Sequence, residues 1–150
     1  MARKPPPEII VAAKAANKAY PTIPPSVGIA QWELESGWGE HTPPGSSNPF
    51  GIKAVAGQPS VMAMTTEYVG GRYIRIPQPF RKYATLAEAF TDHSRLLAMA
   101  APYAAARAHL PDTRAFVIEM AKRYATDPNY ASKLLGQIDA GNLTQYDRGQ

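Results

Sequence analysis

Residues 30–39 read AQWELESGWG and contain the clearest structural signals of the sequence. Glycine is a common residue at the C-terminal end of a helix, so we expect a helix that starts near Ser26 and ends at Gly37. The apolar face of this helix would be formed by Val27, Ala30 and Leu34. The same pattern places Glu35 in the last helical turn.

Two carboxylates in this helix, Glu33 and Glu35, stand two positions apart. Side chains at this spacing leave a helix on nearly opposite faces, so the two groups cannot form one catalytic pair. We expect Glu33 to lie on the surface. The negative end of the helix dipole and a neighbouring indole would raise the pKa of Glu35, which suits a general acid. The residues alone also allow Glu35 to be an exposed helix-end residue without a catalytic role.

A long loop and a β-hairpin are predicted next. Residues 39–60 are rich in Pro, Gly, Ser and Asn, which is typical of irregular structure, and long loops in small domains are often functional. Residues 61–69 and 72–77 have the composition of strands, and the two glycines between them suit a tight turn. The resulting pairing places Glu67 opposite Ile74.

Helical patterns before and after the hairpin complete the expected fold. Their predicted starts are Pro7, the capping-box pair Thr85 and Glu88, Asp112, and the Asp127–Pro128 pair. About five helices around one short hairpin make a mostly helical α+β fold, and we expect residues 1–150 to form a single domain. The last helix should end near Gly141, followed by a loosely held tail.

The composition excludes several kinds of site. The chain has 150 residues, a formal net charge of +4 and no cysteine, which excludes thiol nucleophiles and thiolate metal ligands. The histidines, which are His41, His93 and His109, lack the spacing of metal ligands, so we expect no metal. The positive charge favours an anionic partner, but the basic residues are scattered, which argues against nucleic acid.

The N-terminal residues do not have the pattern of a signal peptide. The apolar run at residues 9–13 stops at Lys14 and is too short for the hydrophobic region of such a segment. Apolar stretches elsewhere are shorter than a transmembrane helix requires. We therefore expect a protein that is made in the cytoplasm and has no stable membrane insertion.

Five segments carry a family resemblance. They are Glu35-Ser36-Gly37-Trp38-Gly39, Asn48-Pro49-Phe50-Gly51-Ile52-Lys53, Thr65-Thr66-Glu67, Phe80-Arg81-Lys82-Tyr83 and Tyr124-Ala125-Thr126-Asp127-Pro128-Asn129-Tyr130. In this order and spacing they are similar to the glucosaminidase domains of glycoside hydrolase family 73, to which bacterial autolysins and flagellar rod-associated muramidase-like domains belong. Each segment alone is weak evidence for the family, but together the five segments span most of the chain.

The resemblance implies a lysozyme-like fold with a β-hairpin lobe beside a catalytic cleft. It also implies an endo-β-N-acetylglucosaminidase that cleaves the β-1,4 bond between N-acetylglucosamine and N-acetylmuramic acid in peptidoglycan. Glu35 matches the catalytic acid of the family. Glu67 matches a second acidic position that acts as base, as water-positioning group or as neither. Tyr124 matches a tyrosine near the N-acetyl group of the substrate, and Tyr130 is the competing candidate.

Other residues of the matching segments are expected to bind substrate. Asn48 and Phe50 would shape the floor of the cleft, while the aromatic faces of Trp38 and Tyr68 could stack on sugars. Two mechanisms stay open: attack by a water molecule that Glu67 activates, or attack by the acetamido oxygen of the substrate with help from Tyr124. Neither mechanism requires a cofactor.

Other functions remain as alternatives. A muramidase or a lytic transglycosylase would also use a single acid at a helix end, and a wall-binding or assembly module could keep this scaffold without turnover. Together with the expected synthesis in the host cytoplasm, the resemblance favours a monomeric phage or prophage endolysin. Such an enzyme would reach the glycan strands of the cell wall, in the periplasm, after its release.

Overall fold

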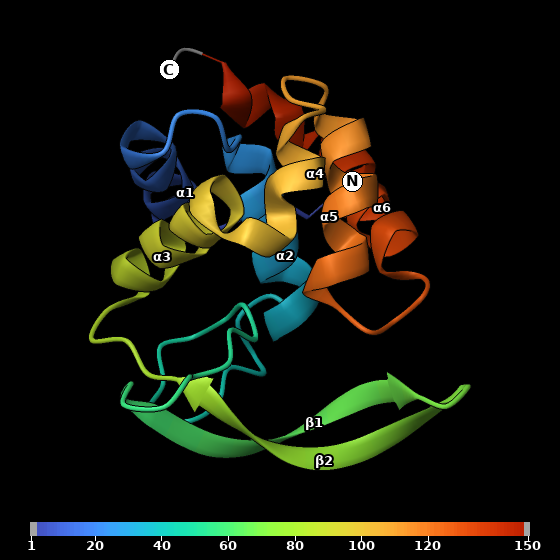
Figure 1. Ribbon diagram of the computed structural model, residues 1–150. Coiled ribbons are helices and arrows are strands. Elements are labelled where there is room, and N and C mark those ends of the chain that lie inside the picture. The colour runs from blue at the N-terminus through green and yellow to red at the C-terminus, as the bar shows by residue number, and fades with distance from the viewer. Residues whose placement is uncertain (1–2, 149–150) are drawn as a thin grey trace.

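The computed structural model describes residues 3–148 and shows a body of helices above a β-hairpin (Figure 1). The elements are α1 (Pro7–Ala19), α2 (Pro25–Ser36), β1 (Ser60–Val69), β2 (Arg72–Arg81), α3 (Leu86–Met99), α4 (Ala104–Arg107), α5 (Thr113–Tyr124) and α6 (Tyr130–Ala140), with short 3-10 helices η1 (Ala101–Tyr103) and η2 (Leu143–Asp147). The predicted α+β class, mostly helical, is confirmed.

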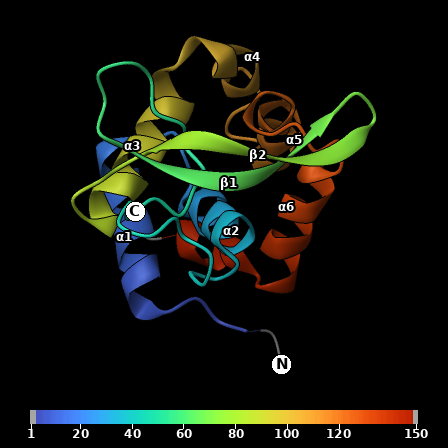
Figure 2. The same ribbon diagram turned by 90° about the horizontal axis from the view of Figure 1, so that it is seen from below.

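Helix α2 lies at the centre of the helical body. It contacts α1, α3, α6 and η2, and the view from below shows it surrounded by other elements (Figure 2). Ten of its twelve residues are buried, so it packs on nearly all sides rather than on one apolar face. The helix ends at Gly37 as predicted, where the backbone N–H of Gly37 donates to the carbonyl of Glu33.

The hairpin has the predicted turn and register. Gly70 and Gly71 have φ angles of 61° and 84°, and Glu67 pairs with Ile74. Strand β2 runs on to Arg81, beyond the expected end at Pro77. The longer strand tolerates its prolines because each strand of a two-stranded sheet has a free edge that needs no N–H donor.

Residues of β1 alternate between the two faces of the hairpin. The inner face, toward the helices, carries half-buried Val61, Ala63, Thr65 and Glu67, while Met62 and Met64 on the outer face are exposed. This alternation has the two-residue period of a strand. It points Glu67 toward the helical body.

Three of the four predicted helix starts, at Pro7, Thr85 and Asp112, are confirmed, and the fourth, at Asp127–Pro128, is wrong. The side chain of Thr85 accepts a hydrogen bond from the backbone N–H of Glu88, and Asp112 caps α5 in the same way. Asp127, in contrast, accepts from the N–H of Asn129, and α6 begins only at Tyr130. Asp127 therefore stabilises the turn that precedes the helix.

The expectation of a loosely held tail is wrong for the part of the tail that the structure describes, up to Arg148, while residues 149–150 lie outside the described residues. Leu143 is fully buried, and the carboxylate of Asp147 accepts hydrogen bonds from the backbone N–H (2.8 Å) and the hydroxyl (2.7 Å) of Ser26. Ser26 lies in the first turn of α2, where free N–H groups and the helix dipole favour a carboxylate. The tail thus caps the central helix.

Among residues 3–148, each helix is too short or too polar to cross a lipid bilayer.

The surface position expected for Glu33 is also wrong. The side chain is buried between α2 and α6, with an exposed fraction of 2%, and its Oε1 accepts a hydrogen bond of 2.9 Å from Nε2 of Gln137. Its Oε2 has no hydrogen-bond partner within the described residues. Burial raises the pKa of Glu33 from 4.5 to about 7, against smaller lowering effects of Gln137 and Arg3.

The raised pKa of Glu33 predicts a pH-dependent effect of Glu33→Gln on stability. The folded-state pKa lies above the unfolded value, so the stabilising contribution of protonated Glu33 is complete below pH 4.5 and is lost as the pH rises through about 7. At pH 8 the variant should exceed the wild type in free energy of unfolding by on the order of 1–2 kcal/mol, with little difference near pH 4. Urea unfolding at both pH values measures this, and an equal difference at the two values would contradict it.

Candidate active site

A cleft lies between the inner face of the hairpin and the helical body. Its walls include residues of β1 and β2, the end of α2, the loop after α2, and the segment that joins α5 to α6. Five of the eight predicted site residues line this cleft, and they are Glu35, Phe50, Glu67, Tyr124 and Tyr130. The fold thus brings together residues up to 95 positions apart in the sequence, from Glu35 to Tyr130.

Glu35 lines this cleft from the last turn of α2. It accepts a hydrogen bond from the hydroxyl of Tyr130. Burial raises the pKa of Glu35 from 4.5 to about 7, while Tyr130 and Lys53 lower it and the charge of Glu67 raises it. The predicted rise is confirmed, but its largest cause is burial rather than the helix dipole or a neighbouring indole.

Gly51 allows the loop after α2 to approach Glu35 closely. Its φ angle is +68°, and a β-carbon built at this position would lie 3.2 Å from Oε2 of Glu35. A side chain here would crowd the carboxylate and strain the backbone. The backbone of Gly51 therefore packs directly against the carboxylate of Glu35. The sequence indicated only that Gly51 belongs to the 48–53 segment, not that it has this contact.

Glu67 reaches the cleft from the hairpin and is held by two polar contacts. Its Oε2 lies 3.3 Å from Nζ of Lys53, and its Oε1 accepts a hydrogen bond of 3.0 Å from Oγ1 of Thr126. Thr126 also accepts a hydrogen bond from the backbone N–H of Tyr68. These contacts fix the second carboxylate in the cleft that contains Glu35.

The two tyrosines of the cleft have different partners. Their rings stack in parallel, with centroids 5.8 Å apart and an interplanar angle of 5°. The hydroxyl of Tyr124 donates to the carbonyl of Phe50 at 2.6 Å, whereas that of Tyr130 donates to Glu35. Tyr130 therefore acts on the acid itself, and Tyr124 fixes the loop that carries Gly51.

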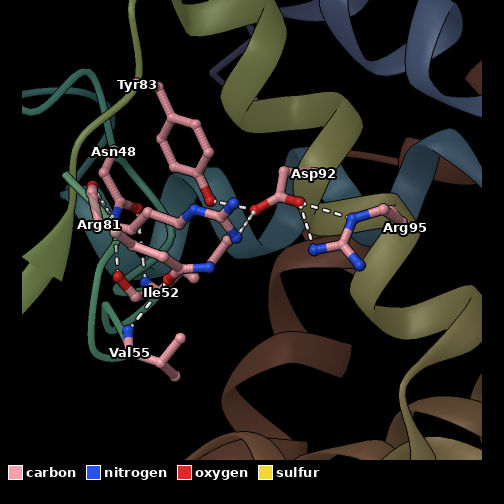
Figure 3. A network of polar contacts seen from close by, with 8 residues as sticks. Asn48, Ile52, Val55, Arg81, Tyr83, Asp92 and Arg95 are labelled. Atoms are coloured by element: carbon pink, nitrogen blue, oxygen red, sulfur yellow. Dashed lines mark hydrogen bonds and ion pairs between the residues drawn. The ribbon is translucent and has the colours of Figure 1, made fainter.

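Asn48 does not line the cleft, and its buried side chain forms hydrogen bonds with the backbone of the loop after α2. It is fully buried, and its Nδ2 donates to the carbonyls of Ile52 (2.8 Å) and Arg81 (2.9 Å), while its Oδ1 accepts from the N–H of Phe50. We therefore assign Asn48 a structural role in place of the expected contact with substrate. Figure 3 shows how Asn48, Arg81 and Asp92 connect this loop, the end of β2 and α3.

Asp92 anchors the base of the hairpin on α3. Its carboxylate accepts hydrogen bonds from Arg81 (2.9 Å), from the hydroxyl of Tyr83 and from Arg95 (2.8 Å), as drawn in Figure 3. Because Arg81 ends β2 and Tyr83 follows it, these contacts set the position of the hairpin relative to the helices. The distance across the cleft depends on this anchor.

Trp38 and Tyr68 are not among the residues that line the cleft. Trp38 packs edge-to-face on Trp32, with ring centroids 5.8 Å apart, and the guanidinium of Arg3 lies 4.3 Å above its ring. Tyr68 makes an edge-to-face contact with Tyr73 near the hairpin turn. Stacking of sugars on Trp38 or Tyr68 stays a prediction.

Across residues 3–148, no three His, Asp or Glu side chains are grouped so that they could hold a metal ion.

The arrangement defines a class of enzyme. An open cleft with a carboxyl group of raised pKa and a second carboxylate is typical of glycoside hydrolases, in which the protonated acid donates to the glycosidic oxygen. The sequence comparison agrees with this class. Residues 11–143 match the model of the glucosaminidase family, described as mannosyl-glycoprotein endo-beta-N-acetylglucosaminidase. The chain belongs to this family, as the resemblance to glycoside hydrolase family 73 indicated.

Curated relatives share this domain within longer proteins. An autolysin of Enterococcus faecalis is 40% identical over 131 residues, which cover 81% of this chain and 18% of the autolysin. The peptidoglycan hydrolase FlgJ of Salmonella typhimurium is 38% identical over 124 residues, or 77% of this chain and 39% of FlgJ. The chain therefore spans less than half the length of these relatives.

Solved structures show the same fold. A mutant peptidoglycan hydrolase from Sphingomonas sp. A1 superposes with a TM-score of 0.79 at 32% identity, covering 91% of this chain and 92% of that one. The catalytic domain of the autolysin Auto from Listeria monocytogenes gives a TM-score of 0.74 at 35% identity, covering 93% and 84%.

The contact of Gly51 with Glu35 predicts a selective loss of activity in Gly51→Ala. Its methyl group would displace the Glu35 carboxyl, and a misplaced catalytic group lowers turnover by about 10- to 100-fold. Gly45→Ala is the matched control, because Gly45 also has a positive φ (+79°) but no atom within 4 Å of the added β-carbon.

Both alanine variants should lose a similar stability of about 1–2 kcal/mol from backbone strain, measured by thermal unfolding. Only Gly51→Ala should lose most of its glycan hydrolysis per folded molecule. Equal activity of the two variants would contradict the role of Gly51.

Proposed function

We propose that this chain hydrolyses peptidoglycan as an endo-β-N-acetylglucosaminidase that cleaves the β-1,4 bond between N-acetylglucosamine and N-acetylmuramic acid. The observation that carries the proposal is the Glu35 carboxyl, buried in an open cleft with its pKa raised to about 7. Family membership supports the reaction type. The names of relatives from Salmonella and Sphingomonas, both peptidoglycan hydrolases, support the substrate class.

Glu35 acts as general acid in this reaction. With its pKa near 7, a substantial fraction of the carboxyl groups carries a proton at neutral pH, ready for the glycosidic oxygen. After transfer, the hydrogen bond from Tyr130 and the charge of Lys53 stabilise the carboxylate that remains. The same surroundings thus serve both protonation states of the acid.

Two routes supply the attack on the anomeric carbon. In the first, Glu67 activates a water molecule, and its bonds to Lys53 and Thr126 hold the carboxylate in place. In the second, the acetamido oxygen of the substrate attacks. Because the proton of the Tyr124 hydroxyl is donated to the carbonyl of Phe50, the phenol oxygen can accept a hydrogen bond from the acetamido N–H and orient that group.

The net charge of the chain suits an anionic polymer. The formal net charge is +4, whereas the two lysines of the cleft, Lys53 and Lys133, are paired with the carboxylates of Glu67 and Asp127. A positive field of this kind increases the rate at which anionic wall fragments approach. The phage or prophage endolysin origin, with synthesis in the host cytoplasm, stays a prediction of the sequence.

Mass spectrometry of fragments released from purified peptidoglycan tests the proposed bond. The wild type should produce new reducing N-acetylglucosamine ends, and Glu35→Gln should lower their release by about 100-fold or more, because the amide cannot donate the required proton. Reducing muramic acid ends would show a muramidase, and anhydromuramic ends a lytic transglycosylase. Absence of fragments from folded wild type would favour a wall-binding module.

The anomer formed first separates the two routes of attack. Direct attack by water inverts the configuration and gives the α-anomer, whereas participation of the acetamido oxygen retains the β-anomer. Early ¹H NMR spectra of the products measure this ratio. If Glu67 is the base, the wild type should invert the configuration and Glu67→Gln should lower turnover by about 100-fold. If the wild type retains the configuration and Glu67→Gln stays active, the attacking group is the acetamido oxygen of the substrate.

A further inference from the structure

A chain of buried polar side chains runs behind Glu35. Nε2 of His93 in α3 lies 2.6 Å from Oε1 of Gln31 in α2, and Nε2 of Gln31 donates to the hydroxyl oxygen of Tyr130 in α6 at 3.0 Å. The Tyr130 hydroxyl in turn donates to Glu35. Gln31 and His93 are fully buried and Tyr130 is 4% exposed, so water does not compete for the two hydrogen bonds of Gln31.

The hydrogen-bond donors of this series of side chains all point toward Glu35. His93 is neutral, because burial lowers its pKa to about 3, and a neutral imidazole has one N–H. Since Oε1 of Gln31 can only accept, that proton lies on Nε2. The amide nitrogen of Gln31 then faces Tyr130, which leaves the Tyr130 hydroxyl proton free to donate to Glu35.

The position of His93 is difficult to explain by packing alone. Its Nδ1 is buried without a hydrogen-bond partner among the described residues, and its ring stacks on Phe50 at 4.2 Å between centroids. An apolar aromatic residue would make the same stacking contact without burying an unpaired nitrogen. What His93 adds is the bond that fixes which end of the Gln31 amide faces Tyr130.

The geometry points to Gln31 and His93 as positioning residues for the reaction: together they orient the Tyr130 hydroxyl so that it donates to the Glu35 carboxyl and holds that group in its reactive position. This inference rests on the proposed role of Glu35 as general acid. Neither residue lines the cleft, so both act through Tyr130.

The effect on the pH profile has a defined sign. The hydrogen bond from Tyr130 stabilises the carboxylate and lowers the pKa of Glu35, as does Lys53 from the loop, while Glu67 from β1 raises it. Tyr124 of α5 also faces Glu35. Loss of the Tyr130 bond with the other groups unchanged therefore raises the pKa of Glu35, and the alkaline limb of kcat moves to higher pH.

His93→Phe tests the inference without touching Tyr130 or Glu35. The variant keeps the ring on Phe50 but frees the Gln31 amide to rotate, so that the Tyr130 proton can turn to Oε1 of Gln31. We expect kcat to fall about 5- to 30-fold with KM unchanged, and the alkaline limb to rise by about half a pH unit or more. Gln31→Met removes the amide donor that holds the Tyr130 oxygen, so the hydroxyl is no longer fixed toward Glu35 and we expect changes in the same direction.

Asn17→Leu is the matched control for Gln31→Met. Asn17 is also a buried amide, and its Nδ2 donates to the carbonyls of Pro21 and Ile23, away from the chain of bonds. A structural loss alone would lower the melting temperature in both variants, with kcat per folded molecule and its pH profile as in the wild type. A wild-type kcat and pH profile in His93→Phe and Gln31→Met would overturn the inference.

The effect of Gln31 on Glu35 must also pass through the Tyr130 hydroxyl. In a Tyr130→Phe background, Gln31→Met should lower kcat no further, and an undiminished effect there would overturn the inference. A ¹³C NMR titration of Glu35 in His93→Phe provides a readout that needs no substrate. If the wild type releases no sugar, the proposed function fails, while a raised Glu35 pKa in His93→Phe still supports the hydrogen-bond chain and an unchanged one still overturns it.

Discussion

Desolvation of the polar side chains on α2 is the interaction on which the site depends. This helix is enclosed by α1, α3, α6 and η2. Its side chains Gln31, Glu33 and Glu35 therefore cannot form all of their hydrogen bonds with water. Each must find a partner in the protein or change its protonation state. Gln31 bonds to His93 and Tyr130, whereas the two glutamates take raised pKa values of about 7.

The two glutamates show that a raised pKa alone does not mark a catalytic residue. Burial is the main cause for both, and both reach about the same value. Glu33 points toward α6 and bonds to Gln137, whereas Glu35 opens into the cleft opposite Glu67. Their opposite directions follow from their spacing on one helix. Access to the cleft, rather than proton affinity, distinguishes the acid.

Local signals predicted the parts of the structure that depend on a few neighbouring residues. The end of α2 at Gly37, the caps at Thr85 and Asp112, and the hairpin turn all follow from residue type and short spacing. The family segments also identified five residues of the cleft. These features need no knowledge of how distant segments pack.

Features that depend on contacts between distant segments were not predicted. Glu33 was expected at the surface because nothing near it in the sequence shows that α6 covers it, and the tail was expected to be loose because its partner, Ser26, lies 121 positions away. The approach of Gly51 to Glu35 and the bond between Gln31 and Tyr130 likewise depend on the final packing. Asn48 was correctly placed in the loop but supports it from the buried side.

The proposed chemistry requires that the fold keeps Glu35 protonated near neutral pH. The most direct measurement is a ¹³C NMR titration of the side-chain carboxyl groups of the wild type, with Glu35→Gln used to assign the Glu35 resonance. We predict a midpoint near pH 7 for Glu35. A midpoint near 4.5, the ordinary value for a glutamate, would contradict it.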